Sequence, residues 1–140
     1  MRALGIDFGE RRIGLALSDP TGTLASPLET VTRRVGKRPP LAKLEGLARA
    51  NEVVQLVVGL PLGRNGGETP WCQEVRRMGD ALAVRLSLPV DYVDERMTSL
   101  RAERAIRSIG LPKAQREKKG RIDAAAAAII LQAWLDGRPR

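Results

Sequence analysis

Three acidic residues, far apart in the sequence, have the type and the local setting to hold a metal ion. Asp7 closes the first apolar segment of the chain, and Glu95 directly follows another apolar segment. Asp123 stands in the first turn of the last helix that we predict. A carboxylate at the end of a buried strand is costly unless it binds a cation or accepts hydrogen bonds. The sequence therefore offers Asp7, Glu95 and Asp123 as candidate metal ligands.

Each of these acids also has a purely structural interpretation. Asp7 could accept backbone N–H bonds in a turn, and Glu95 could pair with a nearby arginine such as Arg96. Asp123 would be favoured near a helix N-terminus by the helix dipole in any case. For Asp123 the alanine run at 124–128 favours the functional interpretation. Small residues let a helix lie close to a sheet, which would bring this carboxylate towards the strand ends.

The rest of the composition narrows the chemistry to an oxygen-ligated metal. The chain has no histidine and a single cysteine, Cys72. This excludes Ser-His-Asp and Cys-His catalysis, histidine-ligated zinc and an internal disulfide. Carboxylate oxygens suit Mg²⁺ or Mn²⁺. Two such ions can activate a water and stabilise the leaving oxygen in the cleavage of a phosphodiester bond.

The basic character of the chain points to nucleic acid as the partner. The formal net charge is +8 and the isoelectric point is about 10.7, which is typical of proteins that bind a polyanion. A cationic segment at 113–121 leads directly into the helix that carries Asp123, so it is well placed for substrate phosphates. Its alternative interpretation is a solvated loop. The candidate nucleic-acid contacts are Arg11, Arg12, Lys113, Arg116, Lys118, Lys119 and Arg121.

Apolar periodicity predicts the elements that must position these residues. The predicted strands are 2–8, 12–18, 25–32, 55–60 and 90–94. The predicted helices are 41–50, 70–86 with Thr69 as N-cap, 98–109 and 121–135, with a basic loop at 110–120. Strands that alternate with helices after an opening meander predict an α/β fold, a mixed sheet with helices on both faces. The length predicts a single domain over residues 1–140.

The N-terminal segment and the apolar runs argue against export and against a membrane. The charge of Arg2 precedes any apolar core that a signal peptide would need. No apolar run approaches the roughly 18 residues that span a bilayer. We therefore expect a cytoplasmic protein without a membrane partner.

Four motifs in order resemble one known family. They are Asp7-Phe8-Gly9-x-x-x-Ile13-Gly14, Val58-Gly59-Leu60-Pro61-Leu62-x-x-x-Gly66, Asp94-Glu95-Arg96-Met97-Thr98, and Lys119-Gly120-Arg121-Ile122-Asp123 before the alanine run. Their order and spacing are similar to those of the YqgF/RuvX family of pre-16S rRNA processing nucleases and Holliday-junction-resolvase-like proteins. The resemblance covers nearly the whole chain. It implies an RNase H-like fold with a five-stranded mixed sheet, and it implies that Asp7, Glu95 and Asp123 form the catalytic, metal-binding site.

The resemblance leaves the substrate and the number of metal ions open. It implies a metal-dependent endonuclease that processes the 5′ end of precursor 16S rRNA, resolves four-way DNA junctions, or does both. The alternative is a non-catalytic nucleic-acid-binding factor that keeps the fold. A junction resolvase must present two active sites, which implies a symmetric homodimer. RuvC-type enzymes use a fourth carboxylate, whereas the last helix here has no further acid before Asp136. Asp94 is therefore a candidate supplementary ligand.

The basic segments predict that nucleic-acid affinity falls steeply with salt. Each phosphate neutralised on duplex DNA contributes a slope of roughly −0.9 to a plot of log affinity against log salt. Neutralising Lys118 and Lys119 together should lower the slope by about two and weaken binding similarly across sequences. Equilibrium binding measured over a range of salt concentrations checks this, and a flat plot for the unmodified chain would contradict it.

Overall fold

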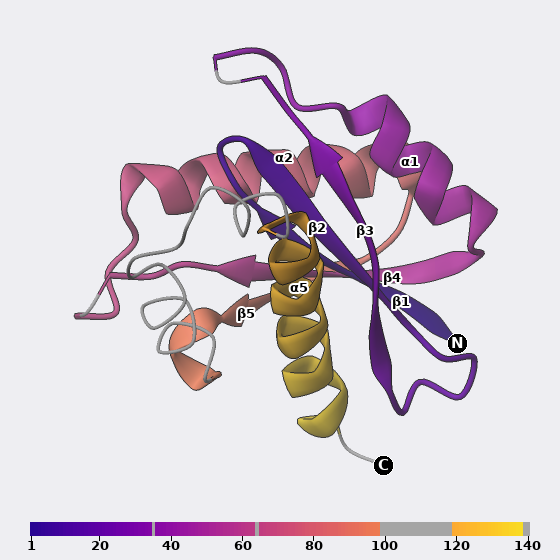
Figure 1. Cartoon of the computed structure of the whole chain (residues 1–140). Coiled ribbons are helices and arrows are strands. Elements are labelled where there is room, and N and C mark those ends of the chain that lie inside the picture. Colours follow the sequence, from indigo (N-terminus) through magenta and orange to yellow (C-terminus); the bar gives the residue numbers. More distant parts are fainter. Residues whose placement is uncertain (35, 64, 99–118, 139–140) are drawn as a thin grey trace.

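A five-stranded mixed sheet forms the centre of the fold (Figure 1). The computed structural model describes residues 1–34, 36–63, 65–98 and 119–138. The strands are β1 (Arg2–Phe8), β2 (Arg12–Ser18), β3 (Ala25–Thr32), β4 (Val53–Leu60) and β5 (Val90–Asp94). Strands β1, β2 and β3 pair antiparallel, whereas β4 pairs parallel to β1 and β5 parallel to β4. The order across the sheet is β3-β2-β1-β4-β5, which confirms the predicted mixed sheet.

Helices cover both faces of this sheet, as predicted. Helices α1 (Leu41–Ala50) and α2 (Pro70–Leu86) pack on one face, and α5 (Lys119–Asp136) crosses the other (Figure 1). A short 3-10 helix, η1 (Glu95–Met97), follows β5. In the described part of the chain no helix is long and apolar enough to cross a membrane.

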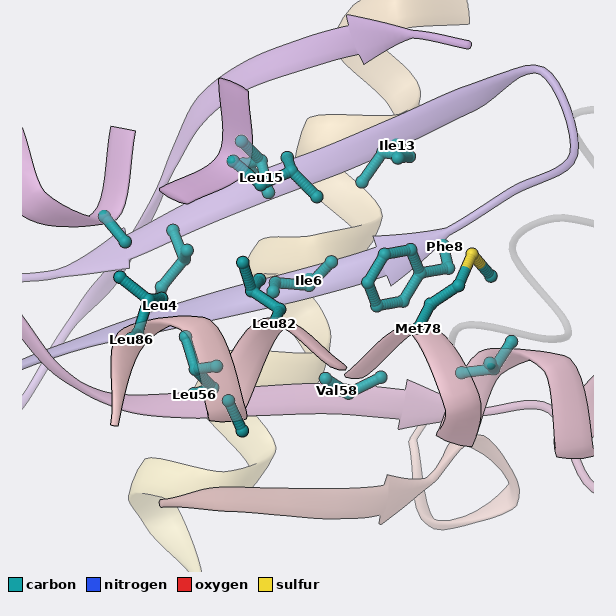
Figure 2. Packing of buried hydrophobic residues seen from close by; sticks show 14 of the residues in the cluster. Leu4, Ile6, Phe8, Ile13, Leu15, Leu56, Val58, Met78, Leu82 and Leu86 are labelled. Carbon is teal, nitrogen blue, oxygen red and sulfur yellow. The ribbon is translucent and has the colours of Figure 1, made fainter. Parts of the chain in front are cut away.

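Side chains alternate along β1 between two unequal cores. Leu4, Ile6 and Phe8 point to the face covered by α1 and α2, where large side chains such as Leu82 and Met78 surround them (Figure 2). The face under α5 is instead built largely from small residues and a few branched ones. Its buried members are Ala3, Ala16, Val57, Ala126, Ala127, Ile130, Leu131 and Leu135.

The small residues bring α5 close to the sheet. A Cβ atom on Gly5 of β1 would lie only 2.7 Å from Cβ of Leu131 on α5. Real Cβ atoms essentially never approach so closely, so the helix could not keep this position over a larger residue. The alanine run was predicted to allow such close packing, and the structure confirms it.

The boundaries of two elements differ from the prediction. Strand β4 begins at Val53 rather than at residue 55, because Val53 is buried and pairs with Arg2 of β1. Helix α5 begins at Lys119 rather than at residue 121. Asp123 is therefore the fifth residue of the helix. The helix dipole acts most strongly in the first turn, and Asp123 lies beyond that turn. This weakens the purely structural explanation of Asp123.

Two predicted segments fall largely outside the described residues. The helix expected at 98–109 lies there apart from Thr98, which ends η1. Most of the basic loop expected at 110–120 lies there too, while its last two residues, Lys119 and Gly120, are helical.

Candidate active site

Asp7 lies at the carboxyl end of β1, on the face of the sheet that α5 covers. It is 7% exposed and pairs across the antiparallel ladder with Gly14 of β2. On its other side, the parallel register that joins Ile6 to Val58 brings Gly59 of β4 beside Asp7. Neighbouring strands lie about 4.8 Å apart. The Asp7 side chain therefore stands between two residues that have no side chain of their own.

Gly14 lies directly beneath the backbone of Asp123. A Cβ atom at position 14 would overlap the carbonyl oxygen of Asp123 and would lie 3.0 Å from the amide nitrogen of Ala124. Helix α5 therefore meets β2 in backbone contact at this point. The contact places Asp123 next to the strand position that pairs with Asp7.

Gly59 lies close to the side chain of Glu95. A Cβ atom at position 59 would lie 3.1 Å from Oε1 of Glu95 and would overlap the Ile130 side chain of α5. Glu95 is the first residue of η1 and is 4% exposed, so its carboxylate lies buried over β4. Two glycines thus mark where two distant acids approach Asp7 from either side.

The three acids lie at the end of the sheet where the strands β1, β4 and β5 have their carboxyl ends. In α/β sheets, ligands bind at this end of the parallel strands. The structure brings together Asp7, Glu95 and Asp123, which the sequence separates by more than 80 and 20 residues. Within the described residues, however, no three acids or thiols already stand close enough to chelate one ion.

One contact in the site engages Asp123 directly. Nε of Arg12, the first residue of β2, donates to Oδ2 of Asp123 at 2.8 Å. The two side chains are 31% and 23% exposed. The sequence offered Arg12 as a phosphate contact and did not foresee this salt bridge.

A second arginine at the rim binds Asp94. Both Nε and Nη2 of Arg96 donate to the Asp94 carboxylate, at distances of 2.7 to 3.1 Å, and this bonding raises the pKa of Arg96. Gly66, with φ of 80°, packs over the same guanidinium, since a Cβ atom there would lie 3.0 Å from Nη1. Arg96 therefore joins the glycine-rich loop at 61–69 to the residue before Glu95. The carboxylate of Asp94 is engaged by this arginine.

The other candidate contacts for nucleic acid are only partly described. Arg11 is exposed in the turn between β1 and β2. Lys119 and Arg121 belong to the start of α5. Lys113, Arg116 and Lys118 lie outside the described residues.

Sequence reasoning missed the role of Gly14 and Gly59. Both were visible as glycines within predicted strands. An isolated glycine in a strand often marks the close approach of another backbone or a ligand. What approaches, here α5 and the carboxylate of Glu95, follows only from the tertiary structure.

Comparison with known proteins supplies the family context. The family model described as RuvX, Holliday junction resolvase, matches residues 1–137. A protein of Anaeromyxobacter dehalogenans (strain 2CP-1 / ATCC BAA-258) is 44% identical over 138 residues, which are 99% of this chain and 98% of that protein. A protein of Roseiflexus sp. (strain RS-1) is 44% identical over 137 residues, 98% of this chain and 95% of its own length. Both carry the name pre-16S rRNA nuclease.

A solved structure shares the fold. RuvC of T. thermophilus, determined in complex with a Holliday junction substrate, superposes with a TM-score of 0.58 at 18% identity. The match covers 96% of this chain and 94% of RuvC. It confirms the predicted RNase H-like fold.

The glycine contacts predict a site-specific cost for Gly14→Ala. The added methyl group must push α5 off β2, because it would overlap the Asp123 backbone. We expect a loss of about 1–3 kcal/mol in the free energy of unfolding together with reduced activity. Denaturant unfolding and a nuclease assay measure the two effects.

Gly46→Ala is the matched control for this substitution. Gly46 lies on the exposed side of α1, and no atom lies within 4 Å of an added Cβ. The same chemical change should there stabilise the protein by about 0.5–1 kcal/mol. A Gly14→Ala protein that is as stable and active as wild type would refute the close contact with Asp123.

Proposed function

This chain belongs to the RuvX family, and on that basis we propose that it is a divalent-metal-dependent endonuclease with Asp7, Glu95 and Asp123 as its metal-holding residues. The observation that carries the proposal is the approach of the Asp123 backbone to Gly14 and of the Glu95 carboxylate to Gly59, the two glycines that flank Asp7. Membership in the family makes the chain a hydrolase that acts on phosphodiester bonds.

The donor set fits a hard metal ion. RuvC-like nucleases generally use divalent metal ions, and three carboxylates supply the oxygen ligands that Mg²⁺ and Mn²⁺ prefer. When bound, such an ion polarises the phosphodiester and lowers the pKa of an attacking water. The backbone of Asp7 lies in the ladder between β2 and β4. Arg12 occupies Oδ2 of Asp123.

The basic residues suit the substrate side of the site. Arg11 is exposed in the turn next to Asp7, and Lys119 and Arg121 precede Asp123 on α5. Together with Lys113, Arg116 and Lys118, they would hold the phosphate backbone while the acids hold the metal. Nucleic acid is the partner class that the family indicates.

We propose the 5′ end of precursor 16S rRNA as the principal substrate, because relatives that match nearly the whole chain at 44% identity carry that name. Such an activity would take place in the cytoplasm. The four-way DNA junction is the second candidate, favoured by the description of the family and by the RuvC complex. It would require a homodimer with two active sites.

Asp7→Asn should abolish cleavage while leaving the fold and much of the nucleic-acid binding intact. The change removes a metal-holding charge but keeps the shape of the side chain. The assay uses purified protein in Mn²⁺ with a precursor rRNA fragment and, separately, a branched DNA junction. Cleavage of only one of these by the wild type identifies the substrate. If the variant cuts at the wild-type rate, Asp7 is not a metal ligand, and if the wild type cuts neither, the chain is a binding factor.

Metal should raise the melting temperature of the wild-type protein, because three clustered carboxylates repel one another until a cation arrives. Glu95→Gln should keep the metal-free protein as stable as wild type, or slightly more so, and should lose the rise on adding Mn²⁺. Ca²⁺ should permit nucleic-acid binding with little cleavage, because its longer bonds and higher coordination number loosen the geometry. A thermal-shift titration tests the first two expectations.

Asp123→Asn is less clean in this test because it also breaks the salt bridge with Arg12. If Mn²⁺ raises the melting temperature of Glu95→Gln as much as it raises that of wild type, the ion binds elsewhere.

A further inference from the structure

We propose that Arg12 is a counter-ion built into the acidic site, which holds Asp123 until a substrate phosphate draws the guanidinium away. Arg12 would thereby couple the binding of the metal to the binding of nucleic acid. The inference rests on the proposed function, since it requires Asp123 to be a metal ligand.

The salt bridge joins two backbones that are themselves held in place. The Gly9 amide donates to the Arg12 carbonyl at 2.9 Å, and Arg12 pairs with Thr32 of β3 in the sheet. Asp123 is held by the backbone contact of α5 with Gly14. Only the two side chains are left to change position, so a rearrangement here needs no movement of the fold.

Arg12 uses one of its donors for Asp123 and has others to offer. Within the described residues the only hydrogen bond or ion pair of its side chain is that from Nε to Oδ2 of Asp123, and its two terminal nitrogens bond to none of them. A guanidinium has five N–H donors in a planar fork that suits the two oxygens of a phosphate. At 31% exposure, the side chain can be reached by a substrate.

The salt bridge opposes metal binding in the absence of substrate. The Asp123 carboxylate is one of the three negative charges that would attract the ion, and Arg12 already offsets it. A unit positive charge about 5 Å from a divalent ion opposes its binding by about tenfold even in a water-like dielectric. A phosphate that draws Arg12 away would remove this opposition. By linkage, metal must then strengthen nucleic-acid binding by the same factor.

The first test measures Mn²⁺ binding to the full chain by calorimetry without nucleic acid. We expect Arg12→Gln to bind Mn²⁺ about tenfold more tightly than wild type. Arg11→Gln is the matched control, because it removes the same charge from the adjacent, exposed position and leaves the salt bridge intact. Equal gains in the two variants would reduce the effect to net charge and overturn the proposal. Weaker Mn²⁺ binding by Arg12→Gln would also overturn it, because Arg12 would then orient Asp123 for the metal.

The second test measures the coupling itself with Ca²⁺, which is expected to limit cleavage. A short RNA duplex should increase the Ca²⁺ affinity of the wild type, and the factor of increase should be several-fold smaller in Arg12→Gln than in Arg11→Gln. If the factor by which RNA increases the Ca²⁺ affinity is the same in both variants, the Arg12 guanidinium does not move from Asp123 to the substrate. That result would overturn the proposal.

Two further variants keep the result unambiguous. If Arg12→Gln fails to fold, Arg12→Met removes the charge but keeps a long unbranched side chain, and its Mn²⁺ affinity should lie above that of wild type. Affinity equal to or below that of wild type would overturn the proposal. Asp7→Asn separates the two hypotheses, because an unchanged Mn²⁺ affinity in that variant would refute the proposed metal site. Loss of binding in Asp7→Asn together with equal gains in the two arginine variants would refute only the role of Arg12.

Discussion

The backbone contact between helix α5 and the sheet is the constraint on which the proposed site depends. Gly14 leaves no room for a side chain beneath Asp123, and Gly59 leaves none beneath Glu95 and Ile130. The alanines of α5 and Gly5 of β1 extend this close packing along the helix. With larger residues at these positions, α5 would stand farther from β1, and Asp123 would leave the neighbourhood of Asp7.

The unequal cores on the two faces follow from this constraint. On the face covered by α1 and α2, a larger set of buried apolar side chains, many of them large, fills the space (Figure 2). The face under α5 has smaller side chains, which let the helix lie closer to the sheet. Burial of apolar area is the dominant favourable term in folding, so the first face carries more of the stability while the second positions the acids.

Bringing acids together has an electrostatic cost that the arginines reduce. Arg12 binds Asp123 and Arg96 binds Asp94, so each of these two carboxylates has an arginine partner. Partly exposed pairs of this kind are worth little for stability, typically up to about 1 kcal/mol. Their positions beside the site, rather than their energies, are the basis for the role in metal and phosphate binding that we propose. The guanidinium of Arg96 also packs against Gly66 of the glycine-rich loop.

Local patterns in the sequence determined the helices and strands, whereas packing determined which residues of different elements contact one another. Strands β1, β2, β3 and β5 and helices α1 and α2 lie where periodicity, Pro70 and the Thr69 cap predicted them, because these signals act between near neighbours in the chain. The starts of β4 and α5 each lie two residues before the predicted ones. For β4 the reason is the pairing of Val53 with Arg2 of β1, which are distant in the sequence.

Residue type, strand ends and motif order indicate the candidate acids, whose role in metal binding stays a prediction. The single domain over residues 1–140 stays a prediction as well. Only the tertiary structure decided that Gly14 and Gly59 flank Asp7, that Asp123 lies over the first of them and Glu95 over the second, and that Arg12 reaches Asp123. Arg12 and Asp123 are 111 residues apart. No local propensity links such positions, because their distance is set by strand order and by how closely a helix can approach a sheet.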